Sequence, residues 1–140
     1  MMEKTFKKYL QEMSRSTARG VEAQLNAIVA DTPFDIVFTN HFYDRLEGRE
    51  DSVTPAELVS SFEKFFRKFH ETLTTMVGKT HAEIAVILKD YASKLNIPLE
   101  IEAGKKDSMG KYTILGITIM RKNPREFRSS GRSEKQFDVY

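Results

Sequence analysis

The sequence predicts an α+β protein in which N-terminal helices pack on one face of a three- to four-stranded antiparallel sheet. Apolar residues recur at three- and four-residue steps in the first half of the chain, whereas short runs rich in β-branched residues occupy the second half. Helices that come first and strands that follow are typical of separate helix and sheet layers. A chain of 140 residues suits one domain with one core.

The first expected helix has apolar residues at helical spacing: Phe6, Tyr9, Leu10 and Met13. Residues 14–20 are small and polar, and we expect a hinge there. A second helix is expected over residues 21–30 and should end before Pro33, because proline disfavours helix in the residue that precedes it. We therefore divide the chain into an amphipathic segment, residues 1–20, that could serve for targeting, and a single α+β domain, residues 21–140.

Two more helices are expected in the middle of the chain. A short apolar run at residues 34–38 is followed by a helix over residues 41–48, which a threonine–asparagine pair can cap. The next helix has the clearest start, because Thr54 and Glu57 are spaced as a capping box. Its apolar stripe, which we expect in the core, consists of Leu58, Phe62, Phe65, Phe66 and Phe69.

The expected strands are residues 84–88, 96–101 and 111–122, with residues 136–140 as a candidate fourth. The first of these runs could instead be helical through Tyr91. The run at 111–122 is dominated by strand-forming residues, and Gly116 is expected to mark a bulge or bend in it. The apolar stripe of the capped helix is expected to face Ile84, Val86, Leu88, Ile114 and Ile117.

The composition excludes several kinds of site. The chain has no cysteine, which rules out disulfides, thiolate metal sites and a cysteine nucleophile. The histidines His41, His70 and His81 lack metal-ligand spacing, so no metal is expected. Glycine-rich phosphate loops and a serine nucleophile elbow are absent from the sequence, so no cofactor is expected either. No apolar run approaches the roughly 18 residues of a membrane span, so we expect no membrane association.

Charge is unevenly distributed along the chain. Residues 1–103 carry 13 basic and 16 acidic side chains, whereas residues 104–140 carry 9 basic and 4 acidic ones. A basic C-terminal part on a mildly acidic body favours an anionic partner.

The first candidate site lies on the helix expected over residues 41–48. His41 and Arg45 are four residues apart and share a helix face, and Arg49 would follow one turn later. A histidine beside two arginines can bind a phosphate group and transfer a proton near neutral pH. The alternative is that His41 closes the helix end and the arginines form a solvated face.

The second candidate site is the end of the long strand and the loop after it. Its basic residues are Arg121, Lys122, Arg125, Arg128 and Arg132. Aromatic residues are interleaved with them or follow closely: Phe127, Phe137 and Tyr140. Cations with aromatics predict binding of RNA or single-stranded nucleic acid through phosphate contacts and base stacking. The alternative is a solubilising basic tail.

Residues 4–12 resemble the capsid-targeting peptide of internal head proteins in T-even-like phages, which has the form Lys-Thr-aromatic-two polar-aromatic-aliphatic-any-Glu. In those phages the maturation protease cuts after the glutamate. The resemblance implies a cleavage site after Glu12, before Met13, and a place in the virion head. The alternative is an N-terminal helix that docks on the rest of the chain.

Residues 37–140 show a second resemblance. A helix with His-Phe-x-x-Arg-Leu-x-x-Arg, then a capped helix and a basic sheet, resembles small tailed-phage proteins of the barnase–EndoU–colicin–RelE (BECR) ribonuclease-like group. Residues 95–98 and 118–122 also resemble uncharacterised proteins of large tailed phages.

The second resemblance implies metal-independent RNA cleavage through attack of the 2′-hydroxyl. His41 would be the general acid or base, and Arg45 with Arg49 would stabilise the scissile phosphate. One of Lys111, Arg121 or Lys122 would hold the RNA backbone or the pentacovalent transition state. The second proton-transfer group is left open among three residues, Tyr43, Glu47 and Tyr140.

The sequence thus predicts a phage-encoded ribonuclease-like protein that binds or cleaves RNA in the cytoplasm of an infected bacterium. The alternative is a non-enzymatic virion protein or a binder of a phage structural or host protein.

Overall fold

The structure is a computed structural model that describes residues 13–48, 52–127 and 134–140. Within these ranges it confirms the α+β class. The elements, in chain order, are α2 (Arg15–Ile28), β1 (Phe34–Phe38), α3 (Asn40–Glu47), α4 (Pro55–Lys79), β2 (Glu83–Asp90), β3 (Leu95–Lys106), β4 (Tyr112–Gly116), β5 (Met120–Arg121) and β6 (Lys135–Val139). No helix in the described ranges has the length and apolar character needed to cross a bilayer.

In the described part of the chain, the strands form one six-stranded mixed sheet in the order β1-β4-β3-β2-β6, with β5 also paired to β3. The pairs β1/β4 and β2/β6 are parallel, and β2/β3, β3/β4 and β3/β5 are antiparallel. The expectation of a three- to four-stranded antiparallel sheet is therefore wrong. Both parallel pairs join segments that are distant in sequence, so no local turn pattern predicts them.

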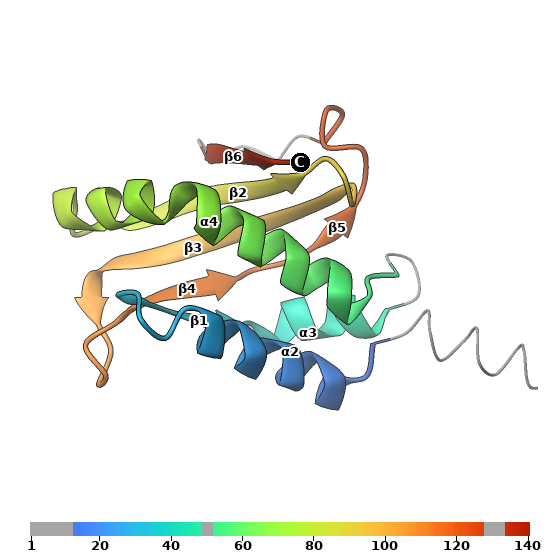
Figure 1. Cartoon of the computed structure of the whole chain (residues 1–140), viewed down its shortest axis with the longest axis horizontal. Coiled ribbons are helices and arrows are strands. Elements are labelled where there is room, and N and C mark those ends of the chain that lie inside the picture. The colour runs from blue at the N-terminus through green and yellow to red at the C-terminus, as the bar shows by residue number, and fades with distance from the viewer. Residues whose placement is uncertain (1–12, 49–51, 128–133) are drawn as a thin grey trace, which may run out of the picture.

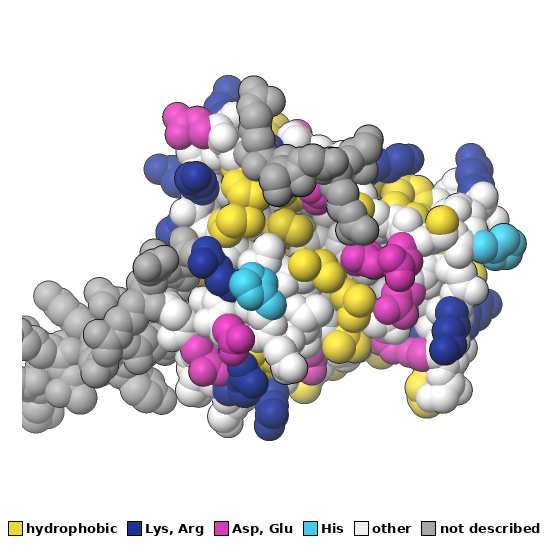
Figure 2. All heavy atoms as spheres, turned by 180° about the vertical axis from the view of Figure 1, so that it is seen from behind, with side chains coloured by type: hydrophobic (Ala, Val, Ile, Leu, Met, Phe, Trp, Pro, Cys, Tyr) yellow, Lys and Arg dark blue, Asp and Glu magenta, His cyan; other side chains and the backbone are white. Residues whose placement is uncertain are grey.

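The helices α2 and α4 lie on one face of this sheet, which we call the helix face (Figure 1). The helix α3 lies beyond the C-terminal end of β1. The opposite face, which we call the back face, is seen in Figure 2. Within the described ranges, no helix covers the back face in these views.

The helix α2 differs from the expectation for the N-terminal region. It begins after Ser14, whose hydroxyl accepts a hydrogen bond from the Thr17 amide, and it continues without a break through Gly20. The expected hinge at residues 14–20 is therefore wrong, and the helix crosses the expected boundary between residues 20 and 21. Burial of Val21 and Leu25 on the same stripe offsets the roughly 1 kcal/mol that a helical glycine costs.

The helix α4 carries the core as expected. Thr54 and Glu57 form the predicted capping box, and the rings of Phe62 and Phe65 are fully buried. Phe65 packs edge-on against Phe137 of β6, with ring centroids 5.6 Å apart. Of the five sheet residues expected in the core, Val86, Leu88 and Ile114 are buried there, and the partly buried Ile84 packs against them.

The strand expected over residues 111–122 is interrupted after Gly116. At this point the amide of Thr39 donates to the Gly116 carbonyl, and the Thr39 hydroxyl donates to the Ile117 carbonyl. Thr39, the N-cap of α3, thus donates to carbonyl groups that a longer strand would use for hydrogen bonds within the sheet. A side chain at position 116 would also meet the rings of Phe38 and Phe42 at 3.1 Å. Ile117 lies outside the buried core, contrary to expectation.

The outer edge of β1 is covered by side chains of α2. Asn26 donates to the Ile36 carbonyl and accepts from the Ile36 amide, both at 2.8 Å. Glu22 accepts from the Phe38 amide at 2.7 Å. These side chains satisfy backbone groups that an edge strand otherwise leaves open.

Candidate nucleic-acid interface

The His41 region lies on α3, which Thr39 caps through its hydroxyl. His41 is exposed, and Arg45 donates from Nε to the Ile119 carbonyl at 3.3 Å. Of the candidate second proton-transfer groups, Tyr43 is buried and Glu47 forms an ion pair with Arg15 at 2.6 Å. Burial and then a hydrogen bond with Glu22 raise the pKa of Tyr43.

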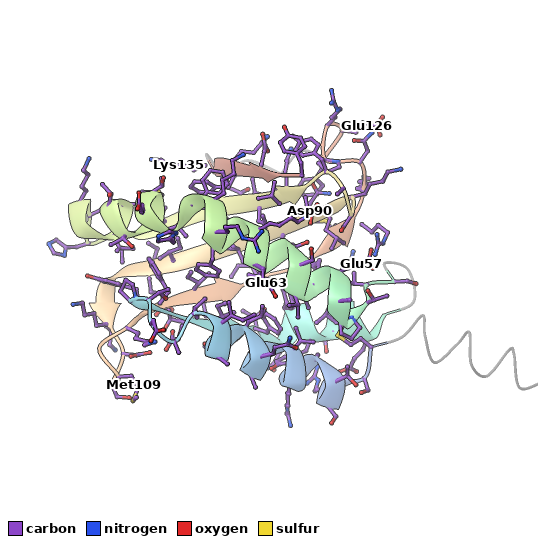
Figure 3. All side chains as sticks on the ribbon, viewed as in Figure 1. Glu57, Glu63, Asp90, Met109, Glu126 and Lys135 are labelled. Atoms are coloured by element: carbon purple, nitrogen blue, oxygen red, sulfur yellow. The ribbon has the colours of Figure 1, made fainter. Side chains whose placement is uncertain are left out.

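The guanidinium of Arg121 is engaged in structural contacts. It donates twice to the Ser52 carbonyl and once to the Ser93 carbonyl, at 2.6–3.0 Å. It also forms a 2.7 Å ion pair with Glu57 at the start of α4; Figure 3 labels Glu57 there. Burial acts to raise the pKa of Glu57, but hydrogen bonds from Arg121 and Thr54 outweigh it, so this pKa lies below its ordinary value. Arg121 therefore ties β5 to α4 and to the turn after β2.

Lys111 lies at the other end of β4 and donates to the Ala30 carbonyl at 2.8 Å. The parallel register pairs Phe34 with Tyr112, next to Lys111, and Phe38 with Gly116. His41 follows Phe38 by three residues, so the length of β1, about 13 Å or more, separates His41 from Lys111. The structure does not bring these two predicted catalytic residues together.

The other predicted site residues fall into two groups. Lys122 and Arg125 are exposed on the segment after β5. Four residues lie outside the described ranges, namely Glu12, Arg49, Arg128 and Arg132.

Two buried polar side chains on the back face hold the segment that carries Lys122 and Arg125. Lys89 donates from Nζ to the carbonyls of Pro124 and Phe127, at 2.8 and 3.0 Å. Asn96 donates to the Lys122 carbonyl at 2.9 Å. A backbone turn is thereby fixed, while the two basic side chains remain exposed.

An aromatic and basic surface lies beside this turn. The rings of Tyr91 and Tyr140 stack at 4.9 Å with an interplanar angle of 16°. Lys68 of α4 places Nζ 5.6 Å from the centre of the Tyr140 ring, and the Arg125 guanidinium lies 6.0 Å from that of Tyr91. Tyr140 is 71% exposed. We call these four residues the Tyr140 surface.

Polar contacts orient the ring of Tyr91 in the Tyr140 surface. The Tyr91 hydroxyl donates to Asp138 at 3.3 Å, and Gln136 donates to the same carboxylate oxygen at 2.8 Å. Burial, followed by the charge of Asp138, raises the pKa of Tyr91. Tyr91 is therefore a neutral phenol at physiological pH, and its ring stacks against the ring of Tyr140.

Tyr140 and Arg125 were predicted from the sequence as part of a basic and aromatic site, whereas Tyr91 and Lys68 were not. Lys68 follows the buried Phe65 and Phe66 on α4, and its position on the exposed side of that helix is readable from the helical period. Its proximity to Tyr140 depends on the parallel pairing of β6, which the sequence did not indicate.

An open depression of about 520 Å³ lies on the outer side of α2 and α4 and contains none of the predicted site residues. It is lined by Gln24, Pro55, Ala56, Val59, Ser60, Glu63, Lys64 and Arg67. Across the described residues, no group of three or more histidine and carboxylate side chains is arranged to hold a metal ion.

No protein-family model matches the chain, and neither a curated protein nor a solved structure shows significant similarity to it.

Proposed function

We propose that this protein binds single-stranded RNA through the Tyr140 surface and does not cleave it. The observation that carries the proposal is the exposed Tyr140 ring, stacked on Tyr91 and flanked by the cations of Lys68 and Arg125. An exposed ring offers a platform for a base, and neighbouring cations contact the phosphates on either side of it. Lys122 is also exposed, on the same segment after β5 that carries Arg125.

Binding is favoured over cleavage because of how the predicted catalytic cations are placed. Arg121 is held by carbonyl groups and Glu57, and Lys111 lies at the far end of β1 from His41. Given the resemblance to phage proteins, the RNA would be encountered in the cytoplasm of an infected bacterium.

Fluorescence anisotropy with a labelled single-stranded RNA tests this proposal. We expect Tyr140→Ala to weaken binding about tenfold, because stacking contributes about 1–3 kcal/mol per base. Tyr140→Phe keeps the ring and should bind like the parent protein. Lys68→Ala should weaken binding and reduce its salt dependence, since one phosphate contact is lost. The matched control is Lys79→Ala, at the far end of α4, which should have little effect.

Two outcomes would contradict the proposal. Equal affinities for Tyr140→Ala, Lys79→Ala and the parent protein would remove the Tyr140 surface from binding. RNA fragments that form in the presence of EDTA, and that disappear with His41→Ala, would show that the protein is a ribonuclease.

A further inference from the structure

The back face carries apolar side chains on its central strands. Val37 of β1 is 44% exposed, and Leu115 of β4 lies directly beside it in the parallel register. Ala85, Pro98 and Ile117 are also partly exposed. We call these five residues the back-face patch. Figure 2 shows hydrophobic side chains gathered in the middle of this face.

The pairing of the strands places the patch residues on neighbouring strands, with Glu100 between Leu115 and Ala85. Leu115 pairs with Glu100, which in turn pairs with Ala85 on the next strand. The amide of Ile117 donates to the Pro98 carbonyl at 3.1 Å. The apolar residues therefore lie on neighbouring strands of one surface.

The strands β1 and β4 have an unusual pattern for a sheet with one face in water. A solvated face normally presents polar residues at alternate positions. Here one outward position on each strand is polar, Asp35 on β1 and Thr113 on β4. The other is apolar: Val37 lies between the buried Ile36 and Phe38, and Leu115 follows the buried Ile114. Such strands are typical of sheets that are covered on both faces. This pattern points to a further layer on the back face.

Carboxylates adjoin the patch. Glu83 and Glu102 are direct partners across β2 and β3, and Glu100 follows on the same face of β3. Like charges directly opposite each other on neighbouring strands are destabilising. A cation from another molecule would relieve this repulsion. Acidic side chains lie beside the hydrophobic ones in Figure 2.

We propose that the back face binds a cationic amphipathic segment of a partner protein. The apolar side chains of that segment would cover the back-face patch, and its lysines or arginines would lie against Glu83 and Glu102. The same carboxylates disfavour an RNA phosphate backbone. They also disfavour a second copy of this face, because like charges across an interface are costly. This surface is therefore separate from the Tyr140 surface.

The first test uses a labelled amphipathic lysine–leucine peptide and the full chain. We expect this peptide to bind, and a version with glutamate in place of each lysine not to bind. Val37→Asp should weaken binding about tenfold or more. The double change Glu83→Gln and Glu102→Gln should also weaken it, while leaving stability equal or higher because the opposed charges are gone. Glu71→Gln, an equivalent charge change on α4, is the matched control and should bind like the parent protein.

Three results would overturn the proposal. The first is no binding of the lysine–leucine peptide at millimolar protein. The second is binding that neither Val37→Asp nor the double glutamine change alters. The third is a concentration-dependent dimer that Val37→Asp dissociates, which would assign the back face to a second copy. Because RNA binding is measured on other residues, failure here leaves the Tyr140 surface untouched.

Discussion

On β1 and β4, the helix face and the back face of the sheet carry similar apolar side chains that differ in their exposure to solvent. On β1, Ile36 is 1% exposed and its neighbour Val37 is 44% exposed. On β4, Ile114 is fully buried whereas Leu115 remains partly exposed. On these two strands apolar side chains occur on both faces, and the face that packs against the phenylalanine stripe of α4 becomes the core. Across the whole sheet the back face is the more polar one, since it also carries Glu83, Glu100 and Glu102.

Two aspartates, Asp90 on the helix face and Asp35 on the back face, differ in the direction of their pKa shifts. Asp90 is buried at the end of β2 beside α4, as labelled in Figure 3. It accepts hydrogen bonds from Ser61 at 2.6 Å and from Lys64 at 3.0 Å. Burial acts to raise the pKa of Asp90, but these bonds outweigh it and hold the pKa below its ordinary value.

Asp35, on the back face of β1, is shifted the other way. Burial, followed by a hydrogen bond with Asp107, raises the pKa of Asp35. Its Oδ1 atom is buried without a hydrogen-bond partner among the described residues. Asp107 instead accepts from the amides of Met109 and Lys111, and its pKa is lowered, with the Asp35 hydrogen bond as the largest cause. Of the two carboxyls, Asp35 is therefore the one that binds a proton at the higher pH. The surroundings on the helix face lower the pKa of Asp90, and those on the back face raise the pKa of Asp35.

The largest expected difference between the faces is in packing. Phe66→Ala should lower the free energy of unfolding by about 3–5 kcal/mol, because it opens a cavity against Phe34 and Phe65. Val37→Ala on the back face should cost less than about 1 kcal/mol, since much of that side chain is already in water. Urea unfolding of both variants measures the difference. Equal losses would mean that the back face contributes to the core as much as the helix face does.

A smaller effect is expected at Asp90. Asp90→Asn should cost about 2–3 kcal/mol at neutral pH, because it removes the charge that Lys64 and Ser61 bind. The folded-state pKa of Asp90 is lowered, so its contribution is present above the unfolded pKa and is lost as the pH falls through the folded pKa. The gap between Asp90→Asn and the parent protein should therefore narrow below about pH 4. A gap that stays constant into acid would show that the carboxylate charge is not responsible.

The smallest expected effect is at Asp35, where substitution by Asn should raise the stability at neutral pH, whereas Asp90→Asn should lower it. Because its folded-state pKa is raised, the contribution of Asp35 is fully present below the unfolded pKa and is lost as the pH rises through the folded pKa. Asp35→Asn would donate to Asp107 at every pH. It should therefore raise the Tm slightly at neutral pH and lose this advantage in acid. A lower Tm of Asp35→Asn at neutral pH would contradict the interpretation that Asp35 and Asp107 share a proton.

Local sequence patterns predicted much of the helix face. The capping box at Thr54 and Glu57 and the stripe through Phe62 and Phe65 depend on contacts within a few turns, and the structure confirms both. The pairing of β1 with β4 depends on contacts between segments far apart in the chain. This pairing was missed. A bulge or bend was expected at Gly116, whereas β4 ends there.

The candidate site was predictable in part for the same reason. Arg125 and Tyr140 were named from a local mixture of basic and aromatic residues, and both lie on the Tyr140 surface. Arg121 belonged to the same local mixture, yet its guanidinium binds Glu57, 64 residues away in sequence. Whether an arginine is exposed or engaged by carbonyls is decided by tertiary contacts that composition does not contain.

The contacts that Asn26 and Glu22 make with β1 also bear on how copies of this chain can associate. They occupy the Ile36 and Phe38 backbone groups that an incoming strand would need. Any growth of the sheet by strand addition is thus confined to the β6 edge. Two copies that paired through β6 would have no further open edge among the strands that the structure describes, so an assembly built from these strands would stop at two and could not extend into a fibre.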